Sequence, residues 1–186
     1  MNFKDVVALL KEKHADAIEA VDETKRDPWI VVKREKLVDV CRTLRDDPKL
    51  NFDHLSLISG VDYPPATIEL VYHLDSLTLN HQLVLKVKIN RTEAELPALP
   101  KVPTLVGIWA TADWHERETF DLMGIDFTGH PNLVRILCAE DWVGYPLRKD
   151  YPWPEEYHGI PCGPFAGQDV NIPPEWEAEG FTTRKA

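Results

Sequence analysis

The chain has 186 residues, of which 44% are hydrophobic and 28% charged, a composition typical of one folded domain, or one domain and a tail. Lysine and arginine number 21 against 31 acidic residues, so the net charge of −10 argues against nucleic acid or an anionic membrane as the main partner. Its apolar runs are far shorter than the roughly 20 residues of a membrane span, and its start lacks a signal peptide's apolar core, so we expect a soluble chain on the cytoplasmic side.

Two stretches near the N-terminus predict helices. Apolar residues recur with helical spacing from Phe3 to Leu10, and Asn2 precedes them as a candidate cap. The same spacing recurs from Leu37 to Leu44, and the DDP sequence at 46–48 ends that helix. Cys41 lies on the apolar face of this helix, which predicts a buried, reduced thiol.

The remaining N-terminal segments predict a sheet. Strands are expected in AIEAV and WIVVK, on either side of a TKRDP turn, and in three longer segments, at residues 52–58, 67–74 and 82–89. The last two alternate apolar and polar residues and are joined by a short link, which predicts a hairpin with Glu69, Lys86 and Lys88 on its wet face. We therefore expect an α+β fold, a two-layer domain with helices on one face of a mixed sheet.

A charged segment in the second half predicts one more helix. We place it at Trp114–Met123, started by an Asp113 and Glu116 capping box and ended by Gly124. A short strand is expected to follow at Leu133–Cys138.

The texture changes beyond residue 144, where proline, glycine and aromatic residues replace any periodicity. We expect residues 1–144 to form the α+β domain and residues 145–186 an extended tail that docks on a partner. Such a tail lies along a surface, because its aromatic side chains are costly to leave in water. The aromatic residues are Tyr151, Trp153, Tyr157, Phe165 and Trp176.

The charged segment does not match a metal-site motif. A zinc protease needs HExxH, but Thr119 stands where the second histidine of the His115–Glu116 pair belongs. His130 and His158 remain possible ligands. The three cysteines are far apart and include no CxxC pair, which predicts neither a disulfide framework nor an iron–sulfur cluster held by this chain alone.

An acid/base site fits the segment no better. Glu116 and Glu118 are two residues apart and point to different sides of a helix, whereas Arg117 and Asp121 are spaced to form an ion pair. The sequence also has no glycine-rich phosphate loop and no GxSxG nucleophile elbow. A capped, salt-bridged helix explains most of these charges.

Two stretches carry a family resemblance. The run WHERETFDLMGIDFTGHPNLVRIL, at 114–137, and GYPLRKDYP, at 144–152, resemble the hallmark of the C subunit of NADH-quinone oxidoreductase, respiratory complex I. The ERE triplet, the DLMGI turn, GHP and PLRKDYP occur in the order that the family shows.

The resemblance implies that the chain is a subunit of a proton-translocating oxidoreductase. This subunit would have no catalytic site and no cofactor of its own. FMN and iron–sulfur clusters would lie on partner subunits, and the whole complex would carry electrons from NADH to quinone. The partners implied are the D subunit of complex I, with the B and I subunits nearby, on the cytoplasmic side of the membrane and peripheral to it.

With this resemblance, the charged residues are interpreted as a partner interface. An arginine can make a two-pronged contact with a partner carboxylate, and the acids can receive basic side chains. The interface is expected to contain Glu116, Arg117, Glu118, Asp121, His130, Arg148, Lys149, Asp150 and Tyr151.

Other interpretations remain open. Arg117 can form an internal ion pair with Asp121 or Glu118. The chain can be a stand-alone acidic binding module, or a small enzyme that uses Glu116, His115 or His130. It can also be the homologous subunit of a complex that takes electrons from ferredoxin or a deazaflavin.

Overall fold

The computed structural model describes residues 2–94, 99–152 and 154–162. Its helices are α1 (Phe3–His14), α2 (Leu37–Asp46) and α3 (Ala112–Met123), with 3-10 turns at Ala15–Ala17, Arg34–Lys36 and Arg91–Ala94. Its strands are β1 (Ile18–Asp22), β2 (Trp29–Val32), β3 (His54–Tyr63), β4 (Thr67–Ser76), β5 (His81–Asn90), β6 (Lys101–Pro103), β7 (Asp126–Thr128), β8 (Glu156–Tyr157) and β9 (Ile160–Pro161).

The first helix begins where the sequence predicts. The side chain of Asn2 accepts a 2.9 Å hydrogen bond from the Asp5 N–H, and the Asp5 carboxylate accepts one from the Asn2 N–H. These two bonds satisfy backbone donors that the first helical turn leaves unpaired. Val6, Val7 and Leu10 form its buried face.

The main sheet has five strands in the order β1-β2-β5-β4-β3. β2 and β5 are parallel and the other pairs are antiparallel, so the predicted mixed sheet is confirmed. The predicted hairpin is β4–β5, in which Glu69 lies opposite Lys88. Lys88 is exposed, whereas Lys86 and Glu69, also predicted on the wet face, are only partly exposed and form a 3.1 Å ion pair.

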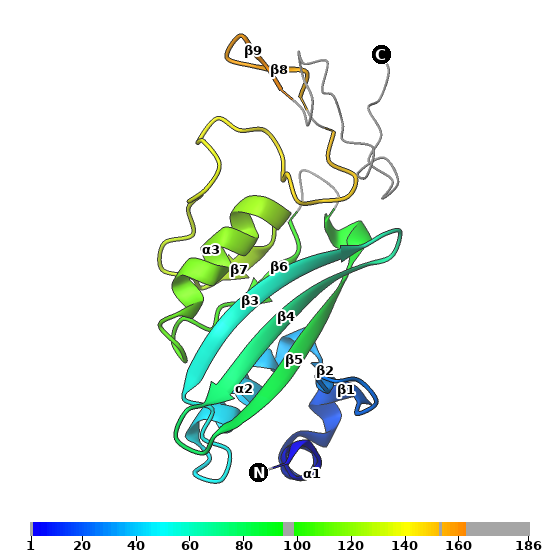
Figure 1. Cartoon of the computed structure of the whole chain (residues 1–186), viewed down its shortest axis with the longest axis vertical. Coiled ribbons are helices and arrows are strands. Elements are labelled where there is room, and N and C mark those ends of the chain that lie inside the picture. Colours follow the sequence, from blue (N-terminus) through cyan, green and yellow to red (C-terminus); the bar gives the residue numbers. More distant parts are fainter. Residues whose placement is uncertain (1, 95–98, 153, 163–186) are drawn as a thin grey trace, which may run out of the picture. The chain divides into compact units, whose positions relative to one another are not determined.

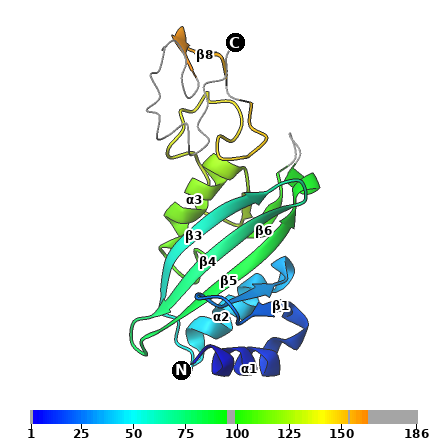
Figure 2. The ribbon, with the colours of Figure 1, turned by 45° about the vertical axis from the view of Figure 1, so that its right-hand side comes forward.

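The other face of the sheet carries the helices, and α1 and α2 lie together on that side (Figures 1 and 2). Their buried residues join those of the sheet in one apolar core, which includes Cys41 as predicted. α3 packs closely against β3, since a Cβ added at Gly60 would lie only 2.8 Å from the Met123 Cγ. The two-layer α+β fold is thus confirmed.

Two local predictions about the second half are wrong. Residues 133–138 form a loop rather than a strand, because backbone N–H groups there bond to the side chain of Asp121 and not to a neighbouring strand. The Asp113–Glu116 capping box does not form, because α3 already begins after Thr111 and the Glu116 carboxylate is turned to another partner. Gly124 ends α3 in the left-handed conformation, as predicted, with φ of 68°.

The chain divides into two compact units after Lys149. Residues 145–149 belong to the first unit, and the described part of the second contains the short β8–β9 hairpin. Trp153, Phe165 and Trp176 of the expected docking tail lie outside the described residues, so the tail stays a prediction. Among the described residues, no helix is both long enough and apolar enough to cross a membrane.

Candidate partner-binding surface around the charged helix

The charged helix α3 has one buried and one exposed side. Ala112, Glu116, Thr119 and Met123 are buried at helical spacing, so a glutamate occupies a position that is usually apolar. Trp114 lies on the other side and is 63% exposed. The motif residues therefore have to be considered one at a time.

Glu116 ties α3 to the segment that precedes it. Its side chain is fully buried, and its carboxylate accepts a 2.7 Å bond from the Leu105 N–H and a 2.5 Å bond from the Thr104 hydroxyl. Burial raises the pKa of Glu116 to about 7, although these two bonds oppose the rise; the negative charge of Asp113 adds to it. Glu116 is therefore an internal tether.

This pKa predicts how stability depends on pH. The folded chain holds the Glu116 proton up to about pH 7, whereas an unfolded chain releases it near 4.5. The contribution of Glu116 to the free energy of unfolding is therefore complete below 4.5 and is lost as the pH rises to about 7. In urea unfolding of the wild type, we expect the free energy of unfolding to fall by roughly 3 kcal/mol between about pH 5 and pH 8 because of Glu116. The Glu116→Gln variant should not show this fall. Exposed Glu118→Gln is the control, and wild-type pH dependence in both variants would contradict the assignment.

Asp121 organises the loop that follows β7. One carboxylate oxygen accepts hydrogen bonds from three successive N–H groups, those of Ile136, Leu137 and Cys138, at 2.7–3.0 Å. The other oxygen lies 3.3 Å from the Arg135 guanidinium. Burial acts to raise the pKa of Asp121, but the backbone bonds outweigh it and hold the pKa below its usual value. Asp121 is thus an internal anion held in a backbone nest.

Arg117 does not pair with Asp121, which corrects the expected ion pair. Its guanidinium lies 4.8 Å from the ring centroid of Trp114, and its Nε donates a 3.2 Å bond to the Val134 carbonyl. Arg117 thus connects the exposed tryptophan of α3 with the loop. Glu118, its neighbour, is exposed.

His130 also faces inward. Its side chain is fully buried, and its Nδ1 accepts a 3.0 Å bond from the Asn132 N–H. The other nitrogen, Nε2, is then the one that carries a proton, and it lies 3.2 Å from the Asp113 carbonyl oxygen. The histidine of the GHP turn therefore fixes the turn against the start of α3.

The PLRK sequence closes the other end of α3. Arg148 donates a 2.8 Å bond to the Met123 carbonyl, which is one of the acceptors that the helix end leaves unpaired. The Lys149 N–H donates a 2.8 Å bond to Asp62 on β3, whose second oxygen lies 2.5 Å from Arg91. This end of the loop is anchored both to the helix and to the sheet.

The structure places three of the nine expected interface residues inside the domain. Glu116, Asp121 and His130 have buried side chains that already bond within the domain, because each satisfies backbone groups of a neighbouring segment. Arg148 is half-buried at the helix end. Arg117 and Tyr151 are partly exposed, and Glu118, Lys149 and Asp150 are exposed. Partner contacts through the nine expected residues stay a prediction.

The loop that follows β7 also has an apolar side, which the sequence did not predict. Among the described residues, ten large hydrophobic side chains are exposed, and half of them lie on α3 or on the loop that follows β7. They are Trp114, Val134, Leu137, Val143 and Leu147, at 47–84% exposure. The apolar residues at 133–138 were interpreted as a strand, so the sequence did not indicate that Val134 and Leu137 are exposed.

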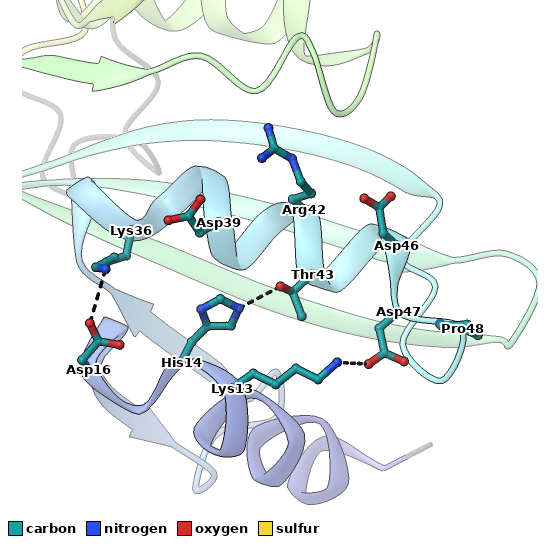
Figure 3. A pocket seen from close by; sticks show the side chains of 10 residues that line it. All are labelled: Lys13, His14, Asp16, Lys36, Asp39, Arg42, Thr43, Asp46, Asp47 and Pro48. Carbon is teal, nitrogen blue, oxygen red and sulfur yellow. Dashed lines mark hydrogen bonds and ion pairs between the residues drawn. The ribbon is translucent and has the colours of Figure 1, made fainter.

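A polar hollow lies elsewhere, between α1 and α2 (Figure 3). Its charged walls are joined by ion pairs, Lys13 to Asp47 at 2.6 Å and Lys36 to Asp16 at 3.4 Å. His14 Nε2 lies 2.7 Å from the Thr43 hydroxyl. These bonds fasten the two helices together.

The histidines considered as metal ligands are dispersed. Within the described ranges, no group of three or more His, Cys, Asp or Glu side chains is placed to hold a metal ion. The Cys138 thiol lies beside Asp121, and burial together with that carboxylate raises the pKa of the thiol.

The fold and these contacts define a small α+β protein whose charged motif builds a rigid surface loop. The model of the family described as respiratory-chain NADH dehydrogenase, 30 Kd subunit, matches residues 30–157. The chain belongs to this family.

Relatives agree with this assignment. The C subunit of NADH-quinone oxidoreductase from Roseiflexus sp. (strain RS-1) is 47% identical over 149 residues, which are 79% of this chain and 82% of that protein. The protein of the same name from Chlorobium phaeobacteroides is 41% identical and covers 82% of this chain and 90% of its own length. The one from Chloroherpeton thalassium is 42% identical, and the match spans 82% of this chain but only 62% of that longer protein.

Two solved structures have a similar fold. The trypsin-resistant fragment (1–134) of Nqo5 matches with a TM-score of 0.56 and 27% identity, over 69% of this chain and 98% of the fragment. A chain of the membrane-bound sulfane sulfur reductase, an archaeal respiratory membrane complex, matches with a TM-score of 0.65 and 29% identity. It covers 80% of this chain and 85% of the other.

Proposed function

We propose that the chain is a cofactor-free subunit of the hydrophilic arm of a proton-translocating NADH-quinone oxidoreductase, with a structural role in assembly. The D subunit of the complex is its direct partner, with the B and I subunits nearby, and FMN and the iron–sulfur clusters lie on other subunits. The chain sits peripherally on the cytoplasmic side of the membrane and meets it only through the complex.

One observation carries the structural role. Two carboxyl groups of the motif are bonded to backbone groups of their own domain, that of Glu116 to Leu105 and that of Asp121 to residues 136–138. A general acid or base has to reach a substrate, whereas these groups hold a loop in one conformation. A surface fixed in this way suits a permanent contact with another subunit, because little ordering is left to occur on binding.

The test is purification of the tagged chain, under mild detergent, from the membranes of its own source cells. Mass spectrometry identifies the subunits that accompany it, and absorption spectra report flavin and iron–sulfur clusters. We expect a protein homologous to the D subunit, together with both cofactors. Recovery of the chain alone and colourless at low salt would contradict the assembly role and favour a stand-alone binding module.

A second candidate differs in the electron donor or acceptor. The similarity to a chain of an archaeal sulfane sulfur reductase favours it, because that respiratory complex is named for a different reaction. In this case the same purification yields the partner subunits and iron–sulfur clusters without FMN. The flavin content of the purified complex therefore separates the two candidates.

Arg117 provides a variant that tests the interface. Arg117→Ala removes the group that connects Trp114 with the Val134 carbonyl, and we expect several-fold less of the D subunit in the purified material. The free energy of unfolding of the isolated chain should fall by less than about 1 kcal/mol, because both contacts are partly exposed. Arg45→Ala, at an exposed position on α2, is the matched control. Equal recovery of the D subunit with both variants would remove Arg117 from the interface.

A further inference from the structure

The strongest unexplained feature of the molecule is its exposed apolar loop. Trp114, Leu137 and Val143 are 63%, 62% and 84% exposed, and Val134 and Leu147 accompany them. Single exposed hydrophobic residues are ordinary, but a group of them in one segment marks an interaction site. We call these five side chains the apolar stripe.

Four members of the stripe, Trp114, Val134, Leu137 and Leu147, lie on α3 or are bonded to it at successive points. Val134 is beside the first turn, since Arg117 bonds to its carbonyl and stacks on Trp114. Leu137 is bonded through its N–H to Asp121, two turns further along, and the Leu147 N–H donates to the carbonyl of Leu122. The loop runs beside α3 in Figure 1. These contacts run from Trp114 to Leu122, a stretch of helix about 12 Å long.

The backbone under the stripe is already fixed. The Asp121 carboxylate accepts hydrogen bonds from three N–H groups of the loop. The Arg135 guanidinium donates a 3.0 Å bond to the Gly144 carbonyl. Two guanidinium groups lie near the centroid of the Tyr145 ring, that of Arg135 at 5.5 Å and that of Arg148 at 5.3 Å. Binding thus requires little further ordering of the loop, which favours affinity.

The exposed charges beside the stripe are mainly acidic. Glu118 on α3 and Glu140 in the loop are exposed, whereas Arg117 and Arg135 are turned toward their own domain. Lys149, at the end next to Leu147, is the exception. A partner that fits this surface has an apolar centre bordered by lysine or arginine.

We propose that the apolar stripe, rather than the motif carboxylates, is the main contact with the neighbouring subunit, whose matching surface is apolar with a basic border. This inference rests on the proposed function and names the chemistry of its interface. A second copy of the chain would set one acidic border against another, and an anionic membrane would repel both.

The test places a charge in the stripe without disturbing the fold. Val143→Asp and Leu137→Asp put carboxylates at exposed positions, so the unfolding midpoint of the isolated chain should stay that of the wild type. Leu77→Asp is the matched control, because Leu77 is 73% exposed in the β4–β5 turn and lies outside the stripe. The measured quantity is the amount of neighbouring subunit, identified by mass spectrometry, that co-purifies with the tagged chain.

We expect both stripe variants to lose the neighbouring subunit by about tenfold or more, and the Leu77 variant to retain it. If both stripe variants recover as much of the neighbouring subunit as the wild type does, the stripe is not the main contact, and the proposed function is unaffected. Failure of the wild-type chain to recover any subunit would overturn the proposed function and the stripe with it.

The acidic border has a separate test. The double variant Glu118→Lys, Glu140→Lys should recover several-fold less of the neighbouring subunit, and the loss should be smaller at high salt. If the double variant recovers more of the neighbouring subunit than the wild type does, the partner surface does not have a basic border. A dimer of the isolated chain that Val143→Asp dissociates would show that a second copy occupies the stripe, and would overturn the assignment to another subunit.

Discussion

Asp121→Ala is expected to lower the free energy of unfolding by roughly 3 to 5 kcal/mol, or to release the loop at residues 133–147 from α3. The substitution leaves the N–H groups of Ile136, Leu137 and Cys138 without their acceptor. It also leaves the half-buried Arg135 without its carboxylate. Urea unfolding of the purified chain gives the free energy, and hydrogen exchange at residues 136–138 reports release of the loop.

Two further variants give this result its meaning. Asp121→Asn keeps one oxygen as an acceptor but removes the charge, so its effect should be intermediate. Glu118→Ala, on the exposed side of the same helix, should change the free energy of unfolding by less than about 0.5 kcal/mol. An Asp121→Ala chain as stable as the wild type, with protected amides at 136–138, would show that the nest does not hold the loop.

Gly124→Ala is expected to lower the free energy of unfolding by roughly 2 to 4 kcal/mol, for two reasons. The residue has a φ of 68°, a conformation that disfavours any Cβ, and it ends α3. A Cβ there would also lie 2.5 Å from the ring of Tyr145, which has to move. The measurement is again urea unfolding, with near-ultraviolet circular dichroism to report the environment of the aromatic rings.

These two causes can be separated. Gly107→Ala is the control, because a Cβ at Gly107 meets no atom within 4 Å and should change stability little. In Gly124→Ala combined with Tyr145→Ala, the ring is gone and only the backbone cost is left, so the effects of the two substitutions should not add. Strict additivity would show that the Tyr145 ring does not press on this position.

The sheet was predictable because its signal is local. In β4 and β5 every second residue is apolar, so the strands, their pairing and their buried face follow from the sequence. α1 was predictable for the same reason, including its cap at Asn2. The family was accessible because the motif residues are contiguous in the sequence.

The roles of the motif residues were not predictable, because their partners are set by tertiary structure. Glutamate side chains are ordinarily exposed, so the burial of Glu116 contradicts the usual preference. Its partners Thr104 and Leu105 become neighbours only when the domain folds. Asp121 was expected to pair with Arg117, which has the helical spacing for an ion pair. In the folded chain Arg135 lies beside Asp121 instead. At residues 133–138, an apolar pattern that predicted a strand supplies the exposed Val134 and Leu137 instead.

The bond between Asp62 and the Lys149 N–H also bears on how the protein folds. It joins groups 87 residues apart in the chain, while the β4–β5 hairpin needs only adjacent segments. Contacts between distant residues require a larger loss of chain entropy, and during synthesis the N-terminal part emerges first. We therefore expect the sheet to form early and the loop beside α3 to close last. A chain released before Lys149 could build its core but would lack this anchor, so only a finished molecule would display the surface in its final form.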